Sequence, residues 1–247
     1  MDIFAFPPVT ALLDLAYRAL LALSSVLEPF TGASAAAAAV ILTTLIVRAL
    51  LIPAGVSQAK AEQTRARLAP RLRLIQQRYR TDPERMQRET MQVYRDEHAS
   101  PLAGCLPLLV QAPIVGILYA VFLHPVLAGR DNALLSETLA GVPLGSSLAG
   151  IVSAGALDPA SIAVFGTVLL MIIAAGEVTR RAFRPVVTSD VTPSFALHAL
   201  GFLSFASAVV AVFVPLAAGL YLAVTVVWTL VQRLVLRRRY PLGSRSS

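Results

Sequence analysis

The sequence has little of the chemistry on which secreted domains and metalloenzymes depend. Cys105 is its only cysteine, which excludes an internal disulfide framework and a cysteine-rich metal site. Charged residues make up 14% of the 247 residues, against about 25% in typical soluble domains. The histidines, His98, His124 and His198, do not follow metal-ligand spacing. We therefore expect no bound metal and no cofactor.

Catalytic motifs are also missing from the sequence. It contains no His-Glu-x-x-His, no Gly-x-Ser-x-Gly and no glycine-rich phosphate loop. No pair of aspartates lies within the apolar segments, which argues against an intramembrane aspartyl protease. The prediction is a protein that is not an enzyme.

What the sequence does have is long apolar segments. Hydrophobic residues make up 56% of the chain, and its mean hydropathy is +0.70. A spanning helix needs about 20 mostly apolar residues, and a helix through all of 195–236 would reach about 63 Å, twice a bilayer core. That last run must therefore turn, near Pro215 and Gly219. The sequence predicts an all-α, polytopic membrane protein with five transmembrane helices, at 34–53, 104–124 and 160–178 and two within 195–236.

A polar, basic segment separates the first two spans. Residues 57–100 hold ten of the 21 basic residues, with apolar residues at helical spacing. Thr81 and Glu84 have capping-box spacing, and Pro83 suits a first helical turn. We expect a cytoplasmic helical hairpin, with its second helix at about 84–97.

The regions outside the spans have less distinct patterns. Asp14 and Arg18 are four residues apart in the apolar stretch 11–27 and can pair on one helix face. This favours an amphipathic helix lying in the membrane interface over an uncleaved signal anchor. Residues 125–159 mix Gly, Pro and polar residues, and we identify no domain there. No internal repeat is apparent.

The distribution of basic residues predicts the orientation in the membrane. Eighteen of the 21 fall on one side of a five-span layout, which places the N-terminus outside and the C-terminus in the cytoplasm. The expected organisation begins with an extracytoplasmic interfacial segment (1–32), a first span (33–56) and the hairpin (57–100). Spans two to five (101–236) and a basic cytoplasmic tail (237–247) follow.

Arg48 is the residue most suggestive of function. A charge at the centre of a span costs about 2.5–3.5 kcal/mol on insertion scales, and no carboxylate lies in mid-span to neutralise it. Arg48 can reach the inner surface by snorkelling, or it can lie in a pocket that water enters from the cytoplasm. Gln111 is the other polar residue deep in a span, where it forms either a helix-helix hydrogen bond or a substrate contact.

Several segments resemble the YidC family of membrane protein insertases. The first is Thr44-Leu-Ile-Val-Arg48 with Pro53, which leads into the basic hairpin. The second is Pro-Leu-x-x-Cys-Leu-Pro-x-x-x-Gln-x-Pro-Ile at 101–114, and the third is Pro215 with Gly-Leu-Tyr221 and Gln232. The sequence departs from the family pattern in a fourth span without methionine and a last span with only Thr225 polar after its tyrosine.

The resemblance implies a function and a site. Family members move transmembrane segments of other proteins into the bilayer through a hydrophilic groove that is open to cytoplasm and lipid. It implies that Arg48 lies in that groove and that Thr44, Gln111, Tyr221 and Thr225 line it. The implied partners are nascent membrane proteins, membrane lipids, the Sec translocon and the ribosome, with no specific nucleic acid. The implied location is the bacterial inner membrane.

Two other classes of function stay open at this point. A small-solute transporter or channel subunit would use Arg48 as an intramembrane anion site. A structural subunit of a larger complex would need Arg48 for no chemistry at all. Replacing Arg48 distinguishes the insertase from the structural subunit, because only an insertase would lose client insertion.

Overall fold

The computed structural model describes residues 7–97, 99, 116–117, 119–122, 124, 126–127, 130–183 and 205–239. Its long elements are helices, and its strands are two residues long. Three apolar helical stretches in the described part are long enough to cross a membrane: 8–50, 159–182 and 216–239. A helical membrane protein is therefore confirmed. Gln111 and most of the expected second span, and the first half of the expected fourth span, lie outside the described residues.

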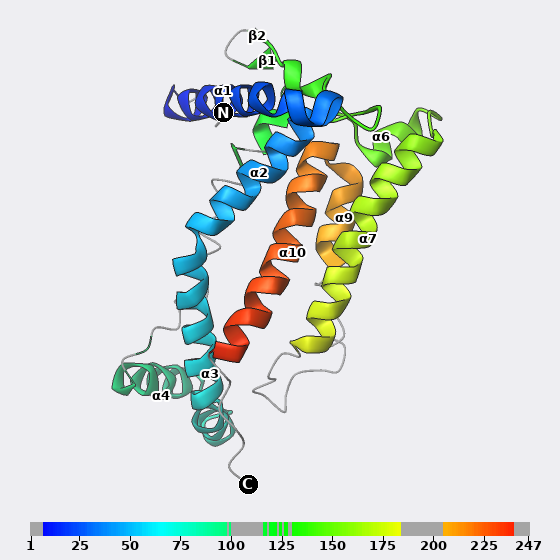
Figure 1. Ribbon diagram of the computed structural model, residues 1–247. Coiled ribbons are helices and arrows are strands. Elements are labelled where there is room, and N and C mark those ends of the chain that lie inside the picture. The colour runs from blue at the N-terminus through cyan, green and yellow to red at the C-terminus, as the bar shows by residue number, and fades with distance from the viewer. Residues whose placement is uncertain are drawn as a thin grey trace.

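Helices α2, α7 and α10 run side by side and form the body of the molecule (Figure 1). Their bounds are Ala35–Leu50, Pro159–Ala182 and Leu216–Arg239. The short helix α9, Ala206–Phe213, packs against α7 and α10. Large apolar side chains such as Leu50 and Leu170 point outward from this body, as expected for helices that face lipid.

A non-helical junction at Val214 and Pro215 separates α9 from α10. Val214 has extended backbone angles, and Pro215 provides no backbone N–H for a continuing helix. The turn within the long apolar run is therefore where the sequence predicted it at Pro215. Gly219, the second marker, lies inside α10 and is buried.

Helix α1, Pro7–Thr31, lies across one end of the body at a steep angle to α2 (Figure 1). Its inward face contributes Leu13, Tyr17 and Leu20 to the core. The predicted ion pair between Asp14 and Arg18 is present, with an N···O distance of 2.7 Å. A short 3-10 helix, η2 (Gly32–Ser34), joins α1 to α2, and the positive φ of Gly32, 55°, accommodates the change of direction.

At the opposite end, α2 continues into α3, Ile52–Arg78, with only Leu51 between them. The expected hairpin begins here, because α3 is followed by α4, Pro83–Asp96, which contacts it. Glu97 accepts hydrogen bonds from Arg67 and Arg71 of α3, at 2.7 and 3.0 Å. These ion pairs hold the end of α4 against α3.

The start of α4 differs in detail from the prediction. Its N-cap is Asp82, whose carboxylate accepts a hydrogen bond from the Arg85 backbone N–H at 3.0 Å. The predicted capping box from Thr81 is therefore wrong by one residue. Both positions offer a side-chain oxygen, and the nearer one to Pro83 caps the helix.

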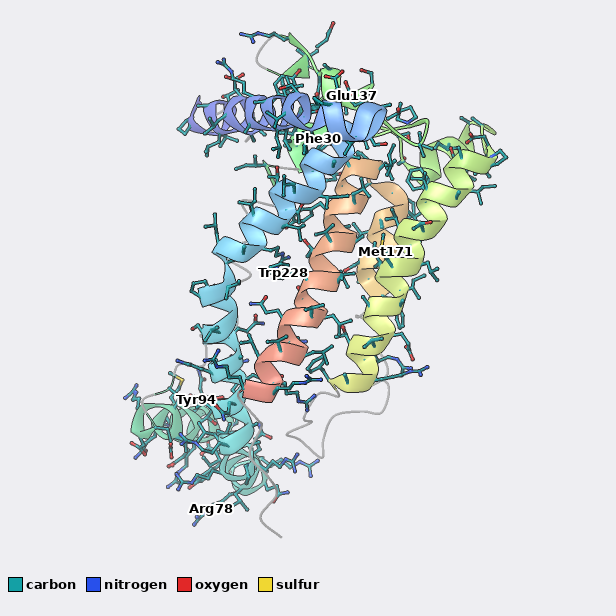
Figure 2. All side chains as sticks on the ribbon, viewed as in Figure 1. Phe30, Arg78, Tyr94, Glu137, Met171 and Trp228 are labelled. Atoms are coloured by element: carbon teal, nitrogen blue, oxygen red, sulfur yellow. The ribbon has the colours of Figure 1, made fainter. Side chains whose placement is uncertain are left out.

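Residues 126–127 and 130–158 form a folded cap over the end of the body where α1 lies. The cap contains two antiparallel hairpins, β1 (Val126–Leu127) with β2 (Arg130–Asp131) and β3 (Thr138–Leu139) with β4 (Val142–Pro143). It also contains η4 (Ala133–Leu135) and α6 (Leu148–Ser153). We call this the upper cap and its end of the molecule the upper end, as in Figure 1. The hairpin of α3 and α4 lies at the lower end, where Figure 2 labels Arg78 and Tyr94.

Candidate functional site

The residues singled out from the sequence lie on two helices that contact each other, α2 and α10. Thr44 and Arg48 are one helical turn apart on α2, and both are buried, with 0% and 9% of their surfaces exposed. Tyr221 on α10 is buried as well, and Thr225 is partly buried one turn further along. Gln111 lies outside the described residues.

Arg48 meets Tyr221 within the body of the molecule. The Arg48 guanidinium lies close enough to the Tyr221 side chain for the two to interact electrostatically. None of the ion pairs formed among the described residues includes Arg48. Because the side chain is buried, Arg48 does not extend to the inner surface, as snorkelling would require. A buried guanidinium with five donors needs further acceptors, and water is the simplest source.

Thr44 has a local partner. Its hydroxyl donates to the Val40 carbonyl four residues earlier, at 2.7 Å. This back-bond satisfies the hydroxyl hydrogen inside the helix.

Polar side chains continue along α10 from Tyr221 to the lower end. Tyr221, Thr225, Thr229 and Arg233 follow at intervals of four residues, which places them in a slanted stripe on one side of the helix. Thr229 donates to the Thr225 carbonyl at 2.8 Å, while the Thr225 hydroxyl oxygen is buried without a hydrogen-bond partner in the described part of the chain. We call these four residues the polar stripe.

The polar stripe ends in an open hollow between α3 and α10. We call it the lower hollow. It is lined by Gly55, Gln58, Ala59, Glu62, Phe183, Thr229, Gln232, Arg233, Leu236 and Arg237. Charged or amide side chains make up half of this lining, so the hollow suits a polar ligand.

Sequence reasoning missed most of the α3 side of this hollow. Gly55, Gln58 and Glu62 stand at spacings of three and four residues after Pro53. That spacing places them on one helix face, and it was the signal available. It was overlooked because the segment was interpreted as an extramembrane hairpin, whereas α3 begins directly at the end of α2.

The hollow at the other end of the stripe is apolar. It is lined by Val40, Tyr119, Phe122, Val210, Val214, Ala217, Ala218, Tyr221 and Leu222. Tyr221 therefore stands at a boundary, with polar side chains below it and aliphatic ones above it.

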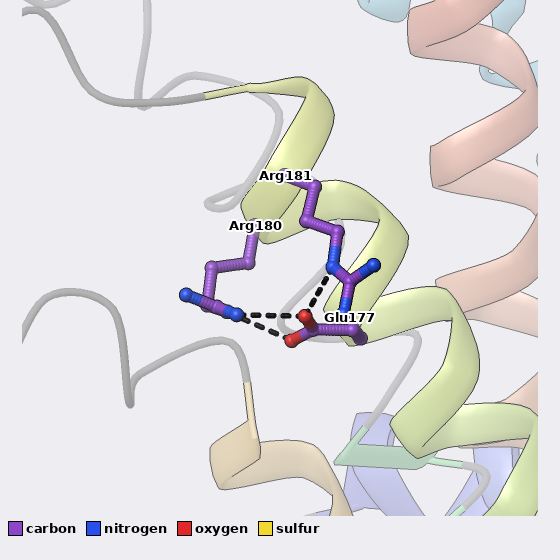
Figure 3. Close-up of polar contacts among 3 residues, drawn as sticks. All are labelled: Glu177, Arg180 and Arg181. Carbon is purple, nitrogen blue, oxygen red and sulfur yellow. Dashed lines mark hydrogen bonds and ion pairs between the residues drawn. The ribbon is translucent and has the colours of Figure 1, made fainter.

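Glu177 is the acidic residue near the lower end of α7, and it is paired with its own helix. Its carboxylate accepts hydrogen bonds from Arg180 at 2.6 and 2.8 Å and from Arg181 at 2.5 Å (Figure 3). The same end of α7 is tied to α10, since Arg237 donates to the Ala182 carbonyl. Glu177 is thus committed to neighbouring arginines rather than to Arg48.

The upper end is closed by hydrogen bonds centred on Asn132. Its side-chain amide donates to the carbonyls of Val121 and His124, at 2.5 and 3.0 Å, and its oxygen accepts from the Leu134 N–H at 3.2 Å. Asn132 is only 6% exposed. It therefore joins helical residues 119–122 to η4 inside the cap.

The cap also holds α1 and α10. The Tyr17 hydroxyl of α1 accepts from the Ala133 N–H at 3.2 Å. The first two N–H groups of α10, from Leu216 and Ala217, donate to the carbonyls of Ser146 and Leu144 at 2.8 and 3.1 Å. These amides would otherwise lack partners at a helix start, so the cap determines where α10 begins.

Comparison with known proteins assigns the chain to a family. Residues 26–243 match the family model described as 60Kd inner membrane protein. The membrane protein insertase YidC of Clostridium perfringens is 33% identical over 115 residues, which cover 47% of this chain and 48% of that protein. The YidC of Aquifex aeolicus is 40% identical over 84 residues, 34% of this chain and 17% of that protein, and the YidC of Clostridium tetani is 37% identical over 84 residues, 34% and 38%.

The matched stretches span half or less of these relatives, while the family model covers most of the present chain. The resemblance noted from Arg48, the 101–114 motif and Tyr221 is thereby confirmed by two independent comparisons. The chain belongs to the YidC family of bacterial membrane proteins, the family of the 60Kd inner membrane protein.

Proposed function

We propose that this protein is a membrane protein insertase that moves transmembrane segments of client proteins from the cytoplasm into the bilayer. The observation that carries the proposal is the buried Arg48 on α2, beside Tyr221 on α10. Family membership supports it, because the similar curated proteins are named membrane protein insertase.

The path we propose runs along the polar stripe. A client's polar tail enters at the lower hollow, passes Thr229 and Thr225, and reaches Arg48 beside Tyr221. Water around Arg48 lowers the cost of moving polar groups to that depth. An acidic client residue at about 4 Å from Arg48 gains about 4 kcal/mol of Coulomb energy at an effective dielectric near 20.

Release into lipid needs no nucleotide in this scheme. The client's apolar helix leaves the stripe for the bilayer because burial of apolar surface contributes about 25 cal/mol per Å². The membrane potential adds to this for a charged tail, at about 2.3 kcal/mol per charge per 100 mV. The upper cap would stop the tail from leaking through before the helix has moved.

For the topology we propose five spans, with the lower end in the cytoplasm of a bacterial cell and α1 in the outer interface. The basic side chains of α3 and α4 gather at the lower end, as the positive-inside rule requires of a cytoplasmic face. In this orientation the hairpin of α3 and α4 and the basic tail are available to nascent chains, the ribosome and the Sec translocon.

Replacement of Arg48 tests the insertase against the other functions. Arg48→Ala should abolish insertion of a dependent client at normal expression, and Arg48→Lys should restore part of it. Arg18→Ala, which removes an exposed arginine paired with Asp14, is the matched control. Crosslinks from position 44 or 111 to nascent membrane chains would locate Gln111 in the client path. Normal insertion by Arg48→Ala would leave only a structural role, and a thermal shift caused by a small anion would favour the transporter.

A further inference from the structure

The lower hollow contains a hydrogen-bond donor that has no acceptor in the described structure. The Trp228 indole N–H, which can only donate, bonds the Gln232 side-chain oxygen at 3.1 Å. This bond fixes the orientation of the Gln232 amide and uses its oxygen. The Nε2 is therefore the part of the amide that still needs a hydrogen-bond partner. That nitrogen is buried and has no partner in the described part of the chain.

Gly55 leaves the space that the Gln232 amide occupies. A Cβ at position 55 would lie 1.9 Å from the Gln232 Nε2, so any larger residue would displace the amide. Gly55 and Gln232 both line the lower hollow, and the unpaired Nε2 lies buried against the α3 backbone at Gly55. A donor in this position calls for an acceptor on a ligand.

Two arginines extend the same donor surface. The guanidinium groups of Arg233 and Arg237 lie over the Phe183 ring, at 5.4 and 5.1 Å from its centre. Stacking on the ring holds both cations at the hollow. Arg237 also donates one N–H to the Ala182 carbonyl, so Arg233 and the remaining N–H groups of Arg237 are the donors left for a ligand. Glu62 provides the one carboxylate in the lining, so the lining has an excess of one positive charge.

We propose that the lower hollow is a binding site for a carboxylate of an acidic peptide segment, held by Arg233, Arg237 and the Gln232 amide. This inference rests on the proposed function, because it identifies the segment as the polar tail of a client before that tail reaches Arg48. Arg233 and Tyr221 are twelve residues apart on α10, about 18 Å, so the tail meets a cation at each end of the polar stripe.

A peptide fits this hollow better than a lipid headgroup does. Half of the lining consists of charged or amide side chains that can bond a carboxylate or a peptide backbone. Of the two large apolar side chains, Phe183 is already stacked under two arginines, and Leu236 is the other. The hollow is also continuous with the polar stripe through Thr229, which a peptide can follow and a lipid cannot.

The test is direct binding by the full chain in nanodiscs of a zwitterionic lipid. The probe is a fluorescent glycine-serine peptide that carries aspartates, compared with the same peptide carrying asparagines. Arg233→Gln with Arg237→Gln should weaken binding of the aspartate peptide by about fivefold, the effect of losing two partly exposed charge pairs. Arg238→Gln with Arg239→Gln is the matched control, because these exposed arginines of the same helix are outside the lining.

Two further variants sharpen the test. Glu62→Gln should tighten binding of the aspartate peptide by about twofold, because it removes a repelling carboxylate. Gly55→Ala should weaken binding, since the amide that it displaces is the end of a flexible side chain and the fold can adjust. Arg233→Gln with Arg237→Gln should weaken binding of the aspartate peptide by the same factor in an Arg48→Gln background. Client insertion by the single Arg48→Ala variant is measured separately, so a failure of the insertase proposal and a failure of this one can be told apart.

Three results would overturn the proposal. Equal weakening by the control pair would mean general attraction to a basic surface. Equal affinity for the asparagine peptide would mean that no carboxylate is recognised. An effect of the Arg233 and Arg237 variants on the binding of anionic lipid alone, with none on the peptide, would assign the hollow to lipid.

Discussion

Asn132→Ala should be among the most destabilising single changes outside the polar stripe. The substitution removes both side-chain donors from the carbonyls of Val121 and His124 and removes the acceptor of the Leu134 N–H. Each lost hydrogen bond costs about 0.5–1.5 kcal/mol. Since the site is buried, three of them give a loss of about 2–4 kcal/mol in the free energy of unfolding.

The loss can be measured by reversible denaturant unfolding in mixed micelles, with hydrogen exchange to locate it. Exchange should accelerate at Leu134 and at the first amides of α10, Leu216 and Ala217, because the same cap holds them. The lower end, such as the start of α4, should exchange at the wild-type rate. This pattern distinguishes loss of the cap from general unfolding.

Asn132→Asp distinguishes the contribution of the side-chain oxygen of residue 132 from that of its amide N–H donors. The aspartate keeps an oxygen for the Leu134 N–H but turns a charged carboxylate toward two carbonyls. We expect this variant to be less stable than Asn132→Ala near neutral pH and to recover as the pH falls, because a protonated carboxyl can donate again. A free energy of unfolding for Asn132→Ala within about 0.5 kcal/mol of wild type, the range of ordinary surface substitutions, would refute the assignment of Asn132 as the centre of the cap.

Three smaller changes test the helix ends and the cap. Tyr17→Phe should cost about 1 kcal/mol in the same unfolding assay, because the Ala133 N–H loses its acceptor. Asp82→Ala should cost about 1 kcal/mol and accelerate exchange in the first turn of α4. Hydrogen bonds from the side chain and backbone N–H of Ser161 hold the pKa of Asp158 below its ordinary value. The ionised carboxylate therefore stabilises the fold at any pH above that ordinary pKa. This stabilisation is lost as the pH falls through the lowered pKa of the folded state. Ser161→Ala should move the pKa of Asp158 back up in an NMR titration, and an unchanged pKa would contradict the assigned cause.

The long helices and their ends could be predicted from the sequence. The apolar runs gave the helices α2, α7 and α10, because about 20 apolar residues in succession have few stable structures besides a spanning helix. The turn near Pro215 followed from length, and the start of α4 from a proline after a capping residue. Each of these depends on local sequence alone.

Features that depend on contacts between distant segments could not be predicted in this way. The upper cap has no periodic pattern, and Asn132 closes it through residues up to eleven positions away in sequence. The lower hollow exists because Gly55 lets α3 approach Gln232 on α10. Nothing within either segment alone indicates the other, so both features became apparent only from the structure.

The partners of the polar groups differ between the two ends of the described structure. At the upper end the buried groups are paired: Asn132 uses both sides of its amide, and the first amides of α10 bond the cap. The buried side-chain atoms left without partners in the described residues are Thr225 Oγ1, Gln232 Nε2 and Gln76 Oε1, which all lie nearer the lower end than Tyr221 does. An unpaired buried polar group costs about 1–3 kcal/mol, so these atoms favour the entry of water or of a client's polar groups. Among the described residues this unmet hydrogen-bonding capacity lies on one side of Tyr221, which is the side from which we propose that the polar tail of a client enters.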